Sequence, residues 1–324
     1  RQLAQDGLSP GSSLDQQLAA LASVPFRLDQ CPLVRLHLLH TGEREAVLLI
    51  VMHHMIGDQW SCAVLGRELA ALYSANRTRT SASLPVLPFQ YADYAEAHRR
   101  WFTERRQDRE LRYWSQRLAG CEAVSLEGDF PRPKQRSFRG AALRLPFSKD
   151  DFAALNLLGT RHQASLAMVL ITALKVLLWR HTGKTDIAIG VPIANRNNLA
   201  SESLLGTFVN TLVLRTDLQG GPSFSEALAR VRTTALEAYA HQDLPFEVLV
   251  QALKLRSDPS RSPLFSVAFN LINTPSRGVH FHGLEWSRRV FDRRAAQFDL
   301  SVNVDPLYDP GIVLEYSTDL FSQA

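Results

Sequence analysis

The spacing of apolar residues predicts alternating helices and strands along most of the chain. Helical spacing over residues 14–22 ends before Pro25, and two strand-like segments follow at residues 33–39 and 46–52, joined by the turn Thr41-Gly42-Glu43. The second segment is apolar throughout, so we expect an inner strand. Further helices are predicted at about 61–73, 91–118, 150–162, 165–181 and 223–241, and further strands at 141–146, 186–191, 208–216, 267–273 and 300–304. This order predicts an α/β fold with mixed sheets.

A segment rich in proline and charge interrupts the periodic pattern near the middle. Residues 120–140 include Asp129-Phe130-Pro131-Arg132-Pro133-Lys134, and the total of 324 residues suits two cores. We therefore predict three parts. They are the remainder of an N-terminal lobe at residues 1–125, an inter-lobe linker at 126–140 and a C-terminal lobe at 141–324.

Composition and charge exclude several classes of protein. The 36 Lys+Arg and 32 Asp+Glu residues give a net charge of +4 with both signs interspersed, so nucleic-acid binding is poorly supported. Three widely spaced cysteines form no CxxC pair, which excludes a disulfide framework and a zinc ribbon and fits a reducing cytoplasm.

The longest apolar stretch, residues 164–179, is shorter than the ~20 residues of a membrane span, so we expect a buried helix and no membrane association. Because the chain begins with Arg1, we expect a segment of a longer polypeptide.

Two histidines and an aspartate crowd the turn that follows the second strand. Neighbouring side chains on a strand point to opposite faces, so only one of His53 and His54 is expected to face a cleft. Asp58 lies four residues after His54, and Gly57 is expected to loosen the turn between them. An imidazole titrates near ~6.5, which suits proton transfer with an attacking amine or hydroxyl. The pattern favours acyl transfer.

Two other interpretations compete with catalysis at this turn. A histidine at a strand end is often a structural residue, although the crowding of two imidazoles and a carboxylate favours a functional site. A metal site would require ligands that converge, and the sequence shows neither a third nearby histidine nor an HExxH spacing. We therefore expect no metal.

Five segments resemble one family, the condensation domains of nonribosomal peptide synthetases. Residues 53–61, His-His-Met-Ile-Gly-Asp-Gln-Trp-Ser, resemble the HHxxxDG core, which chloramphenicol acetyltransferase shares in looser form. The other four occur in the family's order and resemble its YxDYA (residues 91–95), GxFVNT (206–211), HQDxPFE (241–247) and DxSRxPL (258–264) segments. The resemblance extends from about Pro25 to Phe321. No counterpart of the family's opening segments precedes Arg1, so we expect an incomplete N-terminal lobe.

The resemblance implies two chloramphenicol-acetyltransferase-like lobes in a V-shaped pseudo-dimer, with a tunnel between them. Residues 275–297 are expected to cross between the lobes and close the tunnel. The implied reaction is amide-bond formation between a donor acyl thioester and an acceptor amine, both held on 4'-phosphopantetheine arms, with no cofactor bound directly. The implied partners are upstream and downstream peptidyl or acyl carrier domains and an adjacent adenylation domain.

The resemblance also assigns roles to individual residues. His54 is expected to act as base, or to orient the nucleophile and stabilise the tetrahedral intermediate, and His53 to support the turn. Asp58 is expected to form a structural ion pair, with Arg196 as the candidate partner and an arginine of the opening segments as the alternative. Gly57, Gln59 and Trp60 are expected to organise the loop. Ser61 and Asn210 are candidate tunnel or substrate-binding residues, although Asn210 also suits a turn.

One position departs from the family pattern and keeps two alternative functions open. Gln59 replaces the usual glycine after the motif aspartate, which we interpret as a tolerated variant because Trp60 and Ser61 follow it. An epimerisation domain shares the His-His-x-x-x-Asp core. A catalytically silent docking module for carrier domains or a tailoring enzyme is the other alternative.

Overall fold

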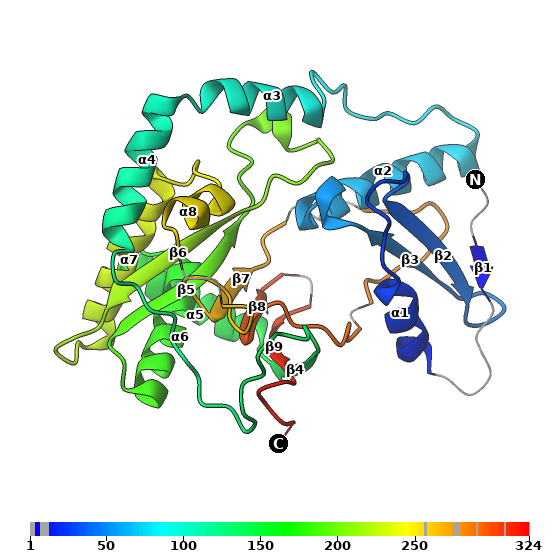
Figure 1. Cartoon of the computed structure of the whole chain (residues 1–324). Helices are drawn as coiled ribbons and strands as arrows, with labels where there is room; N and C mark the ends of the chain where they lie inside the picture. Colours follow the sequence, from blue (N-terminus) through cyan, green and yellow to red (C-terminus); the bar gives the residue numbers. More distant parts are fainter. Residues whose placement is uncertain are drawn as a thin grey trace. The chain divides into compact units, whose positions relative to one another are not determined.

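The chain divides into two compact units. The computed structural model describes residues 4–6, 13–255, 258–274, 279–289, 291–307 and 309–323 (Figure 1). The first unit comprises Arg1–Ala97, Arg196–Phe208 and Thr274–Arg293, and the second comprises His98–Asn195, Val209–Asn273 and Arg294–Ala324. The division therefore falls after Ala97 and not within residues 126–140. Trp114, Leu118 and Val124 explain the difference, because all three are buried in the core of the second unit.

A three-stranded sheet forms the centre of the first unit. Its elements are β1 (Ala4–Asp6), α1 (Leu14–Ser23), β2 (Val34–His40), β3 (Ala46–Met52), the 3-10 helix η1 (His54–Ile56), α2 (Gln59–Thr78), the start of α3 (Tyr91–Trp101) and the 3-10 helix η2 (Leu199–Ser201). The strand order is β1-β2-β3, with β1 parallel and β3 antiparallel to β2. The expectation of an inner strand at residues 46–52 is wrong for the sheet as described. β2 is the middle strand. The apolar residues of β3 lie on both faces of the sheet, and most of them are only partly buried.

Helix α1 covers one face of this sheet and fixes β3. Ser13 caps α1 in a capping box with Gln16, in which each side chain accepts the backbone N–H of the other residue. Leu18 of α1, Leu39 of β2 and Leu49 of β3 form a buried cluster. One face of β3 is therefore packed against α1. The two histidines follow directly after the last residue of β3.

A six-stranded mixed sheet forms the centre of the second unit. Its elements are α4 (Glu104–Arg117), β4 (Gly140–Pro146), α5 (Lys149–Arg161), α6 (Leu166–Thr182), β5 (Asp186–Ile193), β6 (Asn210–Asp217), α7 (Phe224–Ala240), α8 (Phe246–Ala252), β7 (Val267–Leu271), β8 (Leu300–Asp305) and β9 (Gly311–Ser317), besides the end of α3. The strand order is β4-β9-β8-β7-β5-β6, with β7 parallel to both β5 and β8 and the other pairs antiparallel. The predicted α/β fold with mixed sheets is confirmed.

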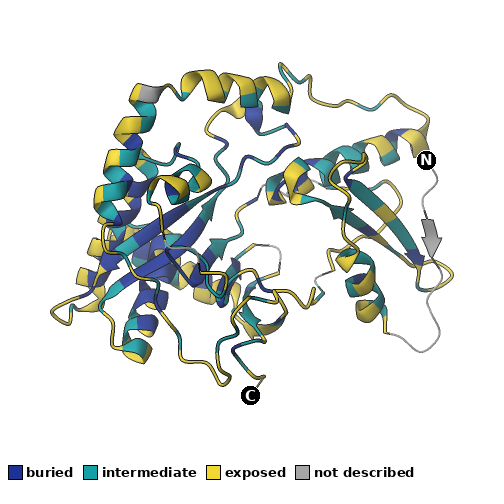
Figure 2. Cartoon of the chain, in the orientation of Figure 1, coloured by how far each residue is buried: buried dark blue, intermediate teal, exposed yellow. Residues whose placement is uncertain are grey.

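The core of the second unit lies between its sheet and its helices. Figure 2 shows buried residues concentrated on the central strands and on α6. Met168, Ile171, Leu174 and Leu178 are among the buried residues of α6, so the expectation of a buried helix there is confirmed. Among the described residues no single helix is long and apolar enough to cross a membrane, and α5 with α6 passes that test only as a pair bent by 97°.

The segment predicted to cross between the lobes is described in part. Residues 275–278 and 290 lie outside the described residues. The adjoining residues contact α2 within the first unit, where the ring of Phe281 packs edge-on against Tyr73 at 5.7 Å and the backbone N–H of His282 donates to the Ser74 hydroxyl at 3.0 Å. This late part of the chain thus contributes to the first unit.

Candidate functional site

His53 follows the last residue of β3 and supports the turn that begins there. Its backbone N–H donates to the Leu33 carbonyl at 3.0 Å, which continues the strand pairing by one residue. Its ring nitrogen Nδ1 accepts the backbone N–H of Met55 at 3.1 Å and so caps η1. The ring also lies edge-on to Phe26, with 6.0 Å between the centroids. Because these contacts occupy the imidazole, we interpret His53 as a structural residue.

His54 is the first residue of η1, and its side chain is exposed. Among the described residues no hydrogen bond engages its ring nitrogens, whereas its backbone carbonyl accepts the hydroxyl of Thr207. The main chain is thus held while the imidazole stays open to solvent. An imidazole in this state is available for proton transfer to or from a bound reactant.

Asp58 is buried at the start of α2 and ties the turn to a distant segment. As the N-cap residue it accepts the backbone N–H and the hydroxyl of Ser61 through Oδ1, both at 2.8 Å. Its Oδ2 accepts the backbone N–H of Phe208 at 3.0 Å. The carboxylate therefore joins α2 to Phe208, which lies 150 residues later in the chain.

Arg196 is the ion-pair partner of Asp58 within the first unit. Its Nη2 lies 3.0 Å from Asp58 Oδ1, and the two side chains are 1% and 5% exposed. Nη1 donates to the Leu204 carbonyl at 2.9 Å, and the guanidinium lies over the ring of Phe208, 4.1 Å from its centroid. Burial lowers the pKa of Arg196, whereas the charge and hydrogen bond of Asp58 oppose the decrease. An arginine keeps its charge in such surroundings, so the pair is a charged one.

Trp60 and Ser61 add two further links to the same segment. The indole N–H of Trp60 donates to the Glu202 carbonyl at 2.9 Å. The buried Ser61 hydroxyl lies 2.8 Å from the Gly206 carbonyl and accepts the Gly206 N–H at 3.1 Å. The Ser61 side chain thus serves the ion-pair network, and these contacts favour a structural interpretation over the predicted substrate contact.

Gly57 lies against Met52 and does not use the conformational freedom of glycine. Its φ of −175° and ψ of 152° describe extended backbone that any residue adopts. A Cβ atom there would lie 2.5 Å from Cε and 2.8 Å from Sδ of Met52. The expectation that Gly57 loosens the turn is therefore wrong, because its backbone conformation does not need a glycine, and a side chain there would require the flexible end of Met52 to move.

Gln59 occupies the first position of α2, and its side chain is exposed. This position has ordinary helical backbone and leaves the ion-pair network untouched. A glutamine can replace glycine there without steric conflict, which supports the interpretation of a tolerated variant.

Asn210 lies in the second unit, at the start of β6. Its amide nitrogen donates to the carbonyls of Gln242 and Leu244, each at 2.8 Å. Its Oδ1 accepts the backbone N–H of Thr211 at 2.9 Å and of Phe246 at 3.0 Å. Because all four bonds go to the main chain, three of them just before or at the start of α8, the contacts favour the structural alternative for Asn210.

Sequence reasoning did not single out Tyr91, Gly206, Thr207 or Phe208 as site residues. The Tyr91 hydroxyl donates to the Thr207 carbonyl at 2.8 Å, and its ring meets Phe208 edge-on at 5.1 Å. Burial raises the pKa of Tyr91, and the Asp58 carboxylate adds to the rise, so the hydroxyl stays protonated and able to donate. The segments that contain these residues matched family motifs, but spacing alone gave no indication that they meet.

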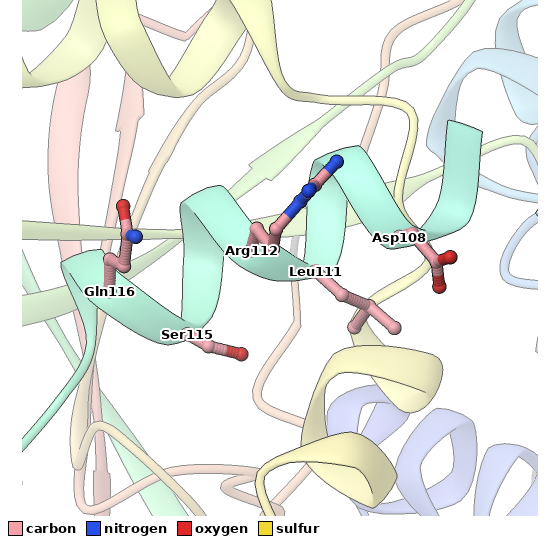
Figure 3. Close-up of a pocket in the computed structure, with 5 residues that line it drawn as sticks. All are labelled: Asp108, Leu111, Arg112, Ser115 and Gln116. Carbon is pink, nitrogen blue, oxygen red and sulfur yellow. The ribbon is translucent and has the colours of Figure 1, made fainter. Parts of the chain in front are cut away.

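A surface hollow on α4 is lined by none of these residues. It has a volume of about 390 Å³, and its lining consists of Asp108, Leu111, Arg112, Ser115 and Gln116 (Figure 3). None of them matches a predicted site, so the candidate site is the exposed His54 on its anchored turn.

Comparison with known proteins identifies the family. The condensation-domain family matches residues 5–324, and the chain belongs to it. Condensation domains are the amide-bond-forming acyltransferases of nonribosomal peptide synthetases.

Similar proteins include several peptide synthetases. One of the linear gramicidin synthase proteins of Brevibacillus parabrevis is 42% identical over 309 residues, which cover 93% of this chain and 6% of that protein. Malpinin synthetase of Mortierella alpina is 40% identical, covering 92% of this chain and 4% of that protein. The chain thus spans only a small part of these curated relatives.

Solved structures with the same fold include the X-domain from teicoplanin biosynthesis. It has a TM-score of 0.85 and 27% identity, and the similarity covers 99% of this chain and 75% of that one. SgcC5 from Streptomyces globisporus has a TM-score of 0.75 and 28% identity, covering 95% of this chain and 72% of that one.

Proposed function

We propose that this chain joins a donor acyl group to the amine of an acceptor amino acid, both presented as thioesters on phosphopantetheine arms. The amine nitrogen attacks the donor carbonyl carbon, the tetrahedral intermediate collapses, the C–S bond breaks and the amine proton is transferred as the thiol leaves. A thioester is already activated, so positioning the amine and handling its proton are the main demands on the protein. Upstream and downstream carrier domains and an adjacent adenylation domain are the proposed partners.

The exposed imidazole of His54 on a fixed main chain carries this proposal. Its ring is unoccupied by described residues, whereas the ring of its neighbour His53 is engaged with Met55 and Phe26. The buried pair of Asp58 and Arg196 holds the far end of the turn. In this proposal His54 receives or shares the amine proton, and Asp58 acts through the structure and not on the substrate.

Replacement of His54 tests the catalytic role. With loaded donor and acceptor carriers, we expect His54→Ala to lower product formation by about 10²–10⁴-fold, the usual contribution of a general acid or base. His181→Ala, which removes an exposed histidine at the end of α6, is the matched control and should retain activity. Product formation by His54→Ala at the rate of the unchanged chain would remove His54 from the mechanism.

The same reagents distinguish the epimerisation alternative. A single aminoacyl-loaded carrier, incubated with the chain and without an acceptor, should keep its α-carbon configuration. Inversion of that centre would replace condensation by epimerisation as the proposed reaction.

A docking function is the second candidate, and one observation favours it. The teicoplanin X-domain shares this fold at a TM-score of 0.85, and a structure of an X-domain in complex with OxyB matches with a TM-score of 0.83 and 28% identity. The free imidazole of His54 argues for catalysis instead, because a binding module has no need of an anchored, exposed base. Carrier binding without product under conditions of full loading would favour docking.

A further inference from the structure

Three consecutive residues, Gly206, Thr207 and Phe208, hold the whole turn that carries His54. The carbonyl and N–H of Gly206 meet the Ser61 hydroxyl, and the N–H of Phe208 meets Asp58. Between them, the Thr207 hydroxyl donates to the backbone carbonyl of His54. We call residues 206–208 the bracket, because they bind the turn at its first residue, at its aspartate and at the first turn of α2.

Tyr91 fixes the bracket from its other side. Its hydroxyl donates to the Thr207 carbonyl at 2.8 Å, so Thr207 is held through its main chain while its side chain reaches His54. A Cβ atom at Gly206 would lie 2.1 Å from Cδ2 of Tyr91, which shows how closely the ring packs on the bracket. Tyr94 adds a second ring against Phe208, with 4.5 Å between the centroids.

We propose that Thr207 is a positioning residue for His54, and that Tyr91 acts through Thr207 to the same end. The Asp58–Arg196 pair fixes the distal end of the turn, where its hydrogen bonds go to Ser61, Leu204 and Phe208. The Thr207 hydroxyl is the side-chain group that binds the His54 main chain. This inference rests on the proposed function, since it concerns the placement of the imidazole that handles the amine proton.

The hydrogen bond between Thr207 and His54 is expected to contribute little to the stability of the fold, because of its exposure to solvent. The hydrogen bond between Thr207 and His54 lies in an exposed region, so water can replace the lost hydroxyl when it is removed. Loss of the hydroxyl should therefore change the free energy of unfolding little and the orientation of His54 much. A displacement of about 1 Å at a reacting group can lower a rate by about 10²-fold.

The test compares Thr207→Val, which keeps the shape and removes the hydroxyl, with Thr207→Ser, which restores it. Thr233→Val is the matched control, because the Thr233 hydroxyl also binds a backbone carbonyl, that of Ala229, on an exposed part of α7. In the carrier assay we expect Thr207→Val to lower kcat about ten- to a hundredfold with little change in KM. Thr207→Ser should recover most of the rate, and Thr233→Val should match the unchanged chain.

A spectroscopic readout is independent of turnover. In the full chain labelled with ¹³C-histidine, the His54 ring signal, assigned by its loss in His54→Gln, should shift or broaden in Thr207→Val and in Tyr91→Phe. The other histidine signals should stay in place, and the midpoint of urea unfolding should change little for Thr207→Val.

The possible outcomes separate this inference from the proposed function. If His54→Ala abolishes activity while Thr207→Val keeps both the rate and the His54 signal of the unchanged chain, the positioning role is wrong and the catalytic role stands. If His54→Ala is fully active, the catalytic role of His54 fails, although condensation itself stands. In that case an altered His54 signal in Thr207→Val still supports the bracket, and an unaltered one overturns it.

Discussion

The carboxylate of Asp58 and the guanidinium of Arg196 lie 3.0 Å apart, although 138 residues separate them in the sequence. Both groups are buried, and each has further hydrogen bonds to the main chain of residues 201–208. The pair therefore brings a loop from between β5 and β6 against the turn that carries His54.

Removal of one partner of this pair should be strongly destabilising. Arg196→Met leaves a buried, unpaired carboxylate, and we expect the free energy of unfolding to fall by about 3–5 kcal/mol. Arg144→Met is the control, because Arg144 and Asp309 form an exposed ion pair whose loss should cost less than about 1 kcal/mol. Urea unfolding of both variants checks the difference, and equal losses would contradict the importance of burial. The double variant Asp58→Asn/Arg196→Met should lose less than the sum of the two single changes.

Two glycine substitutions should have opposite effects. Gly206→Ala places a Cβ atom 2.1 Å from the Tyr91 ring, so we expect a loss of about 1–3 kcal/mol from overpacking. Gly66→Ala, in the interior of α2 with nothing within 4 Å, should stabilise the chain by about 0.5–1 kcal/mol. Thermal unfolding of the two variants measures both effects. In a Tyr91→Ala background the cost of Gly206→Ala should shrink, and an undiminished cost would show that Tyr91 is not its cause.

Lys175 should make stability depend on pH above neutrality. The side chain is fully buried in the second unit, where its Nζ donates to the carbonyls of Ile187 and Leu214 and to the Thr216 hydroxyl. Burial, and after it the charge of Arg117, lower the pKa of Lys175 to about 7, although Asp186 and Cys121 act in the opposite direction.

The direction of this effect follows from proton binding. Between pH about 7 and about 10.5 the unfolded chain keeps the proton that the folded chain has lost, so the free energy of unfolding rises with pH. Lys175→Met should remove this rise, which is on the order of a few kcal/mol, whereas Lys184→Met, at an exposed lysine, should keep it. Urea unfolding at pH 7, 8, 9 and 10 gives the slopes. Parallel slopes for Lys175→Met and the unchanged chain would show that Lys175 stays charged in the fold.

Local patterns predicted the elements well, because caps and periodicity act over a few residues. The helix predicted at residues 223–241 is α7, which begins with a capping box of Ser223 and Glu226, and the strand predicted at residues 46–52 is β3 with the same bounds. The edge position of β3 was not predictable, since a strand's neighbours depend on the whole sheet. β9 was missed altogether. The acceptors of Lys175 come from β5 and β6, so no spacing within its own helix indicated them.

In the candidate site, too, the sequence indicated neighbouring residues but not contacts between distant segments. The histidine pair and Asp58 stand out because they are close together in the sequence, and Arg196 was proposed through the family resemblance. The link from Thr207 to His54 spans 153 residues. Such a contact depends on where the loop after β5 folds, which periodicity does not record. The expectation for Gly57 failed because its backbone is extended, a conformation that any residue adopts and that the sequence alone does not reveal.

Residues 196–208 belong to the first unit although they connect two strands of the second, and this affects where hybrid synthetases can be joined. β5 and β6 are antiparallel neighbours, with Ile193 opposite Asn210, so the loop between them connects the two strands of one hairpin. Residues 196–208 of this loop nevertheless belong to the first unit. A chimera joined after Ala97 would inherit Asp58 from one parent and its arginine from the other. Transplanting residues 196–208 together with the part that carries His54 would keep Asp58 and Arg196 from the same parent.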